Sequence, residues 1–319
     1  MTAAIECIDL ARTYVTRSMF GKRQEVQALK GINFSVDSGK VFGLLGPNGS
    51  GKTTTMRILA TLLTPTSGKA IVHGFDSYKN PAEVRNRIGL ILGGERGLYG
   101  RLTGRENLKY FAVLNKMSKN KTEKRVMEVL NQVNLTEAAD MKTETYSRGM
   151  KQRLHIARGL LTNPDVILMD EPTIGLDPEG AHELRSLIPK MTESGKSVIM
   201  TTHYMFEADE LSDSIAILLK GSIVAMGTPI EIRKNFSKTS VWDIILRKDI
   251  PDRITELSNI QGVVNTIKSN EGPVLKLMVY VDPKLDMREP IESILGVENI
   301  ENMAIRDSTL EEAYLSIIR

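Results

Sequence analysis

The chain has 319 residues, enough for one large domain with a small one or for two of medium size, and it can bury a core. Its 42 Lys and Arg nearly balance its 39 Asp and Glu, and no long basic stripe carries interleaved aromatic residues, which disfavours nucleic acid as a main partner. A single cysteine, Cys7, excludes an intramolecular disulfide and indicates a reducing compartment; we expect it to pack as a small strand hydrophobe.

Signals for export or for membrane insertion are not evident. The N-terminal residues lack the basic start and the apolar core of a signal peptide. No apolar run approaches the length that crosses a bilayer, and the longest are strand-sized, such as Val166 to Met169. We therefore expect a protein that is soluble or is held at a membrane by another component.

The N-terminal region predicts an antiparallel strand pair. Ile5 to Leu10 alternates weakly and predicts an edge strand, and Leu29 to Val36 predicts a second strand. The polar stretch from Thr16 to Gln27 predicts a solvated loop between them. Tyr14 follows the first strand; its ring could stack on an adenine, and a packed tyrosine is an equal alternative.

A glycine-rich loop follows the apolar run Val41 to Leu45, which predicts a buried strand, and precedes a helix predicted from Thr54 to Leu63. This order is the context of a phosphate-binding loop, because glycines let the backbone turn its N–H groups toward a polyphosphate at the helix N-terminus. Lys52 adds a full charge at the outer phosphates, and the Thr53 hydroxyl is placed to hold Mg²⁺. The loop comprises Gly46, Pro47, Asn48, Gly49, Ser50, Gly51, Lys52 and Thr53.

The middle of the chain predicts a helical insertion within an α/β domain. Short strands are predicted at Lys69 to Val72 and at Ile88 to Leu92, and the spacing then becomes helical from Leu102 to about Leu161. Ser147 is a natural N-cap for the last of these helices. The segment Lys116 to Arg125 is strongly basic, which favours a solvated helix end.

Polar side chains follow two later strands. Val166 to Met169 predicts a buried strand that ends in Asp170 and Glu171, and Ser197 to Met200 predicts another that leads to His203. The carboxyl ends of parallel strands meet at one edge of a sheet, where ligands gather. Asp170 is suited to the Mg²⁺ shell, Glu171 to polarising a water, and His203 to contact with a γ-phosphate.

In these motifs the chain resembles the ATP-binding cassette transporter ATPases, over about residues 5 to 232. The phosphate loop is followed, in the family's order, by Ile88-Gly89, Tyr146 to Met150, Asp170-Glu171, Gly175-Leu176-Asp177-Pro178 and His203. The resemblance implies an α/β, P-loop NTPase cassette with a mixed sheet, an antiparallel β edge and a helical subdomain at about residues 95–163. It also implies ATP and Mg²⁺ as the cofactors.

The resemblance further implies a head-to-tail dimer, with ATP between the phosphate loop of one subunit and the signature segment, Ser147 to Met150, of the other. The N–H groups at the start of the signature helix would complete the cage around the γ-phosphate. It implies that Glu171 and His203 are catalytic, as base and γ-phosphate sensor, and that Thr53 and Asp170 hold the metal. The implied nucleotide-binding residues are Tyr14, which stacks on adenine, the phosphate loop with Thr54, and Ser147, Gly149 and Asp177.

Two departures from the family pattern stand out. Gly93-Gly94-Glu95 occupies the place of a usual glutamine, so that residue's contact with Mg²⁺ and water is unassigned, with Glu95 as a candidate substitute. The signature reads Tyr-Ser-Arg-Gly-Met where Leu-Ser-Gly-Gly-Gln is commonest, but Ser147 and Gly149 are retained. Signatures of this kind resemble the branch that serves drug, antibiotic, sodium or polysaccharide export, in which the membrane subunit is usually a separate chain.

Residues 236–319 extend beyond the ATP-binding domain predicted at residues 1–235. Their pattern predicts the order β-α-β-β-α-β, which favours a small ferredoxin-like or related α+β module. Ser308 or Thr309 is expected to cap a last amphipathic helix. A dimer contact, a regulatory role and a plain stabilising appendage remain alternatives for this domain.

We predict an ATP-hydrolysing motor subunit at the cytoplasmic face of the cell membrane. It would pair with a copy of itself or with another ATPase subunit and drive a separate transmembrane permease. The alternatives are a soluble cassette ATPase acting on ribosomes or DNA, and a regulatory nucleotide-binding module with little hydrolysis. The sequence does not specify the transported substrate, because in this architecture the cargo pathway belongs to the membrane chain.

Overall fold

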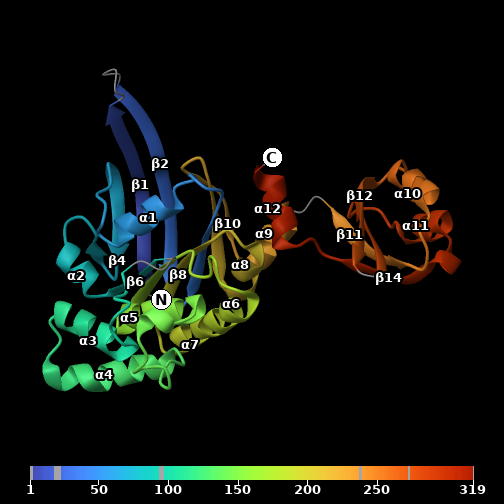
Figure 1. Cartoon of the computed structure of the whole chain (residues 1–319). Coiled ribbons are helices and arrows are strands. Elements are labelled where there is room, and N and C mark those ends of the chain that lie inside the picture. Colours follow the sequence, from blue (N-terminus) through green and yellow to red (C-terminus); the bar gives the residue numbers. More distant parts are fainter. Residues whose placement is uncertain (1–2, 18–22, 93–96, 237–238, 272–273, 319) are drawn as a thin grey trace. The chain divides into compact units, whose positions relative to one another are not determined.

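The computed structural model describes residues 3–17, 23–92, 97–236, 239–271 and 274–318. The chain divides into two compact units, Met1–Pro229 with two sheets and Ile230–Arg319 with one (Figure 1).

A six-stranded sheet with the order β10-β9-β3-β8-β7-β6 forms the middle of the first unit. Neighbouring strands are parallel except for the pair β9 and β10, which is antiparallel. The strands read as nearly continuous apolar runs because both faces of the sheet are covered. They are β3 (Val41–Leu45), β6 (Ile88–Leu92), β7 (Val166–Asp170), β8 (Ser197–Thr202), β9 (Ser214–Leu219) and β10 (Ser222–Gly227).

Alternate residues of the central strands face two separate cores. On one face, Phe42 and Leu44 of β3 pack against α1 (Lys52–Leu59) and a second, antiparallel sheet. On the other face, Ile167 and Met169 of β7 pack against the helices. The phosphate loop and the acid pair therefore lie at the ends of strands that are fixed from both sides.

The antiparallel sheet has the order β2-β1-β4-β5, with β1 (Ala3–Arg17), β2 (Arg23–Asp37), β4 (Ser67–Val72) and β5 (Phe75–Asp76). The prediction of an edge strand at Ile5–Leu10 is wrong, because β1 pairs with both β2 and β4. Cys7 packs there as the predicted strand hydrophobe: it is 2% exposed, and burial raises the pKa of its thiol.

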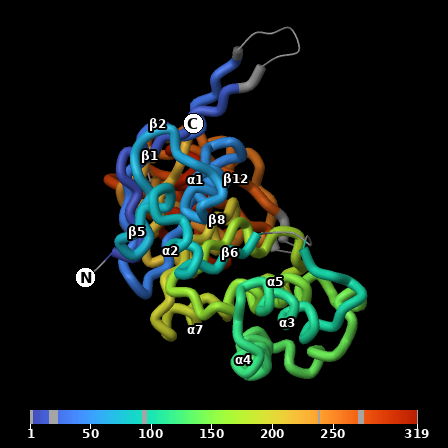
Figure 2. Tube along the Cα trace, turned by 90° about the vertical axis from the view of Figure 1, so that its left-hand side faces the viewer, coloured from blue at the N-terminus to red at the C-terminus, as the bar shows by residue number. Residues whose placement is uncertain are grey.

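The polar stretch from Thr16 to Gln27 is only partly a loop. Backbone pairing continues to Arg17 and Arg23, and residues 18–22 lie outside the described part of the chain. Figure 2 shows the outer part of this hairpin without another element alongside. Solvent reaches these strands, as the half-exposed side chains of Val15 and Val26 show. Most of their residues are therefore polar, and this polar composition alone suggested a loop.

The helical periodicity between Leu102 and Leu161 is confirmed as three helices: α3 (Gly104–Leu114), α4 (Lys119–Gln132) and α5 (Arg148–Leu160). A capping box begins α3, in which the Thr103 hydroxyl accepts from the Glu106 N–H and the Glu106 carboxylate accepts from the Thr103 N–H. The remaining helices of this unit are α2 (Pro81–Arg85), η1 (Thr143–Thr145), α6 (Pro178–Arg185), α7 (Leu187–Glu193) and α8 (Met205–Leu211).

The second unit has the predicted β-α-β-β-α-β order and an antiparallel sheet, β12-β13-β11-β14. This order and pairing are those of the ferredoxin-like split β-α-β arrangement. Its core contains Trp242, the single tryptophan of the chain, which is 8% exposed. The elements are α9 (Pro229–Phe236), β11 (Ser240–Leu246), α10 (Pro251–Ser258), β12 (Val263–Glu271), β13 (Val274–Val281), α11 (Arg288–Leu295), η2 (Val297–Asn299), β14 (Ile300–Arg306) and α12 (Leu310–Ile318).

The last helix, α12, begins with a capping box formed by Thr309 and Glu312. Thr309 supplies the capping hydroxyl, while the Ser308 hydroxyl donates to the Thr239 carbonyl oxygen. Arg306 of β14 binds the Glu312 carboxylate through both terminal guanidinium nitrogens, at 3.0 and 3.1 Å. Burial would raise the pKa of Glu312, but hydrogen bonds from Arg306, the Thr309 N–H and Tyr280 outweigh it and lower that pKa.

His155 of α5 is an uncharged polar group in the helical core. It is 1% exposed, and neither ring nitrogen has a hydrogen-bond partner among the described residues. Burial, together with the charge of Arg158, lowers its pKa from 6.5 to about 4. Unfolding at pH 5 therefore takes up a proton that the folded protein does not bind.

We expect the His155→Leu variant to flatten the acid dependence of stability. For the native chain the free energy of unfolding should fall as pH drops from 6.5 toward 4, by about 2 kcal/mol at pH 5 through this residue alone. Urea denaturation of both proteins at pH 7.5 and pH 5 measures the difference. His182→Gln, at an exposed histidine of α6, is the control and should retain the native slope.

Candidate nucleotide site

The phosphate loop connects β3 to α1, as the sequence predicted. Its backbone has left-handed φ angles at Gly46 and at Gly51, which precedes the first residue of α1. A Cβ on Gly46 would lie 2.2 Å from the Leu218 carbonyl oxygen, so no larger residue fits. The Lys52 side chain folds back over the loop, where its Nζ donates to the carbonyl oxygens of Gly46 at 2.6 Å and Pro47 at 3.2 Å.

The acid pair lies at the end of β7. Asp170 is the last residue of that strand, and Glu171 follows with φ 49°, a left-handed conformation that is unusual for a glutamate. Thr201 of β8 holds both residues. Its hydroxyl donates to Asp170 Oδ1 at 2.6 Å and accepts from the Glu171 N–H at 3.0 Å.

Three of the predicted site elements meet at one edge of the sheet. Parallel pairing aligns Leu45 of β3 with Thr202 of β8, and Thr201 with Asp170 of β7. His203 follows β8 directly, and its Nδ1 lies 3.5 Å from Glu171 Oε2. Burial lowers the pKa of Lys52, whereas the negative charges of Glu171 and Asp170 act to raise it. The phosphate loop, both carboxylates and the histidine therefore share one electrostatic environment.

Glu207 of α8 is a site-supporting residue that the sequence analysis missed. This carboxylate is only 3% exposed, and its Oε2 accepts from the hydroxyls of Thr202 at 2.9 Å and Thr173 at 3.0 Å. Its Oε1 lies 3.6 Å from Arg185 Nη1 of α6. It thus ties the residue before His203 to the segment after Glu171. No local pattern identifies it, because two of its three partners, Thr173 and Arg185, are more than twenty residues away in the sequence.

The signature segment is capped as predicted. Ser147 precedes α5, and its hydroxyl accepts from the Met150 N–H at 3.2 Å. Asp177 caps α6 in the same way by accepting from the Gly180 N–H at 2.8 Å. Ser147 and Asp177 are exposed, and Gly149 is half-buried. Within one chain Ser147 and Asp177 cap their own helices, and Gly149 lies in the first turn of α5.

Tyr14 lies beside the start of α1. Its hydroxyl is 3.3 Å from the Thr54 hydroxyl, and the Arg12 guanidinium carbon lies 5.1 Å from the centre of its ring. The half-buried tyrosine therefore contacts, through its hydroxyl, the helix that follows the phosphate loop. Gly93, Gly94 and Glu95, which stand where a glutamine was expected, lie outside the described residues.

Comparison with known proteins gives the family. Residues 29–174 match the family model described as ABC transporter. The chain is 34% identical over 322 residues to the daunorubicin/doxorubicin resistance ATP-binding protein DrrA of Streptomyces peucetius, across 99% of this chain and 92% of that protein. It is 37% identical over 215 residues to the ABC transporter ATP-binding protein NatA of Bacillus subtilis, across 67% of this chain and 87% of the relative. The chain belongs to the ABC transporter family.

Solved structures agree with this ABC assignment. A dimeric ATP-binding cassette in a post-hydrolysis state with ADP and Pi is 28% identical, with a TM-score of 0.62 across 70% of this chain and 98% of the cassette. The cbiO1 structure from Clostridium perfringens, part of the ABC transporter complex cbiONQ, is 28% identical with a TM-score of 0.65, across 74% of this chain and 92% of cbiO1.

The chain is therefore an ATP-binding and ATP-hydrolysing subunit of an exporter-type ABC transporter. Ribosome-acting, DNA-acting and purely regulatory alternatives are not favoured. Among the described residues no helix is both long and apolar enough to span a bilayer.

We expect Thr201→Val to slow ATP hydrolysis by about tenfold, because it removes the hydroxyl that fixes both Asp170 and Glu171. Thr201→Ser keeps the hydroxyl and should restore most of the turnover. Thr192→Val, on α7, is the matched control and should leave kcat unchanged. Equal turnover in the Thr201→Val and native proteins, measured as steady-state phosphate release, would show that this hydroxyl does not position the acids.

Proposed function

We propose that the site residues act as one half of a shared ATPase site in a homodimer. The phosphate loop, Asp170, Glu171 and His203 of one protomer face the signature segment, Ser147 to Met150, of the other. Support comes from the two helix starts: α1 follows the phosphate loop directly, and α5 begins at Arg148 with the exposed Ser147 as its N-cap. Two such N-termini on opposite sides of a γ-phosphate would offset its charge.

Glu171 acts in this proposal as the general base. It accepts a proton from a water as the water oxygen attacks the γ-phosphorus, and the bond from that phosphorus to the bridging oxygen of ADP breaks. Lys52 and His203 bind the γ-phosphate oxygens, and Tyr14 stacks on adenine. Asp177 lies in the loop that connects the two sites of the dimer.

Mg²⁺ fits the donor set at Thr53 and Asp170. The Thr53 side chain is exposed at the start of α1, and Asp170 has one oxygen engaged by Thr201, which leaves Oδ2 for another contact. Hydroxyl and carboxylate oxygens are the ligands this ion prefers. When bound, Mg²⁺ would neutralise charge on the β- and γ-phosphate oxygens.

We further propose a peripheral position at the cytoplasmic face of the membrane, next to a separate permease. The names of several relatives concern resistance to daunorubicin, doxorubicin or linearmycin, which supports a drug or antibiotic as the class of cargo. We also propose an ATP-binding domain at residues 1–235, with its helical subdomain at about 95–163, and an accessory domain at residues 236–319 for dimer contact, regulation or stabilisation; the first compact unit ends at Pro229.

The observation that carries the catalytic proposal is the pair formed by Glu171 and His203. Their side chains lie 3.5 Å apart, while the backbone N–H of Glu171 donates to both the carbonyl and the hydroxyl oxygens of Thr201. A carboxylate fixed in this way, at a sheet edge that also holds Lys52, is placed to direct a water at a bound phosphate.

We expect Glu171→Gln to retain ATP binding and to lose at least a hundredfold in turnover, because an amide cannot accept the proton. Without hydrolysis to open it, the dimer should accumulate with ATP and elute as such in size exclusion. Glu193→Gln, at an exposed glutamate of α7, is the matched control and should behave as the native chain. A monomeric Glu171→Gln protein with native turnover would refute both the base assignment and the shared site.

A further inference from the structure

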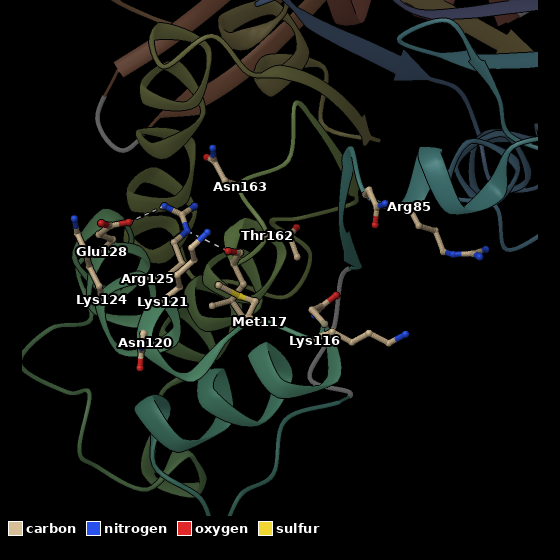
Figure 3. Close-up of a pocket in the computed structure, with 13 residues that line it drawn as sticks. Arg85, Lys116, Met117, Asn120, Lys121, Lys124, Arg125, Glu128, Thr162 and Asn163 are labelled. Atoms are coloured by element: carbon tan, nitrogen blue, oxygen red, sulfur yellow. Dashed lines mark hydrogen bonds and ion pairs between the residues drawn. The ribbon is translucent and has the colours of Figure 1, made fainter.

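A basic cavity of about 750 Å³ lies in the first unit, apart from the nucleotide site (Figure 3). Four segments line it: the end of α2 at Arg85, the turn between α3 and α4 at Lys116, the first turns of α4, and residues 161–163 after α5. Asn86 and Asn163 precede β6 and β7, whereas the nucleotide site lies where β7 ends. The cavity is thus at the opposite edge of the sheet, roughly 15 Å away along a five-residue strand.

Positive charge dominates the lining of this cavity. Five side chains are basic, namely Arg85, Lys116, Lys121, Lys124 and Arg125, and one, Glu128, is acidic. Glu128 is already paired with Arg125, whose Nη1 lies 3.1 Å from its Oε2. Among the residues that the structure describes, the side chains of Lys116, Lys121 and Lys124 form no hydrogen bond or ion pair. The charge of these lysines is therefore available to a ligand.

Lys121, Lys124 and Arg125 share one face of α4, because residues three and four apart are neighbours on a helix. Figure 3 shows these three side chains together, with Met117 and Thr162 between them and Lys116. Arg125 is held in place, since its Nε donates to the Leu161 carbonyl oxygen at 3.1 Å and its Nη2 to that of Leu160 at 2.5 Å. One cation of the wall is thus rigid and the two lysines beside it are adaptable.

A further cation lies under the same wall. Lys196 is 9% exposed, and its Nζ donates to Asn163 Oδ1 at 2.8 Å and to the Pro164 carbonyl oxygen at 2.9 Å. Burial lowers its pKa, and the positive charge of Arg125 lowers it further. Lys196 thus places a further positive charge beneath the cavity, close to the carboxylate of Asp165, which acts to raise that pKa.

The start of α4 is electrostatically uncompensated. The first turn contains no acidic residue, and Ser118 makes no side-chain capping hydrogen bond. Lys119 and Lys121 instead add positive charge at the positive end of the helix dipole, which is unfavourable for an isolated helix. An anion in the adjacent cavity would offset both the dipole and the lysines.

We propose that this cavity binds a ligand that carries phosphate groups, either a free polyphosphate or the headgroup of an anionic lipid. Lysines, a fixed arginine and the amides of asparagines together suit phosphate oxygens, which accept several charge-assisted hydrogen bonds. A concave site of this volume suits a small ligand better than a peptide segment. The site is independent of the ATPase roles proposed above.

Pyrophosphate binding by calorimetry, with the phosphate loop kept saturated with ADP, tests the free-ligand form. We compare the native chain with two double variants. The cavity variant is Lys121→Ser/Lys124→Ser. The control is Lys142→Ser/Lys190→Ser, which removes two exposed lysines elsewhere and therefore the same amount of charge. The cavity variant should bind pyrophosphate at least tenfold more weakly, and the control should keep native affinity. Circular dichroism verifies that both variants are folded.

Co-sedimentation with phosphatidylcholine vesicles, with and without phosphatidic acid, tests the lipid form. Binding only to the acidic vesicles, lost in the cavity variant and kept in the control, supports a headgroup as the ligand. Equal losses of binding in the cavity variant and the control would overturn the proposal. So would a native chain that binds neither pyrophosphate nor acidic vesicles. A native chain that binds poly-glutamate but neither pyrophosphate nor acidic vesicles would also overturn the proposal, because the cavity would then bind acidic peptides.

Discussion

The register of three parallel strands is the constraint on which the ATPase site depends. Strand β8 pairs with β3 on one side and with β7 on the other, so that Leu45, Thr202 and Asp170 end these strands at one edge of the sheet. The phosphate loop, His203 and Glu171 each follow one residue later. A slip of one residue in β8 would turn Thr201 away from both acids. The apolar cores on both faces hold this register, so the residues that keep the chemistry aligned are mostly those that never touch the nucleotide.

Two buried side chains convert that register into a defined site. Thr201 ties the acid pair to the neighbouring strand, and Glu207 ties Thr202 and Thr173 to Arg185 of α6. Since Asp177 is the N-cap of α6, the same carboxylate links the end of β8 at Thr202 to the helix that follows Asp177. Buried, fully bonded carboxylates of this kind cost much to disturb, which suits a connection between two sites.

Local pattern was enough to place the phosphate loop, β7 with its acids, the cap at Ser147 and the β-α-β-β-α-β order, because each depends on residues close in sequence. It failed where contacts between segments distant in the sequence determine the position of a strand or the role of a side chain. The interior position of β1 follows from pairing with β4 some sixty residues later, and Glu207 is recognisable only from its three partners. The basic run at Lys116–Arg125 is largely exposed, as predicted for a solvated helix end, but only the fold shows that Arg85 and residues 161–163 face it.

The location of Trp242 has a spectroscopic consequence. It is the single indole of the chain, and it is nearly enclosed by the core of the second unit, while the ATPase machinery belongs entirely to the first. Emission excited near 295 nm therefore reports on the accessory domain alone, whereas far-ultraviolet dichroism averages both units. A comparison of the two signals during one denaturation would tell whether the domains melt as a single cooperative block or as separate ones.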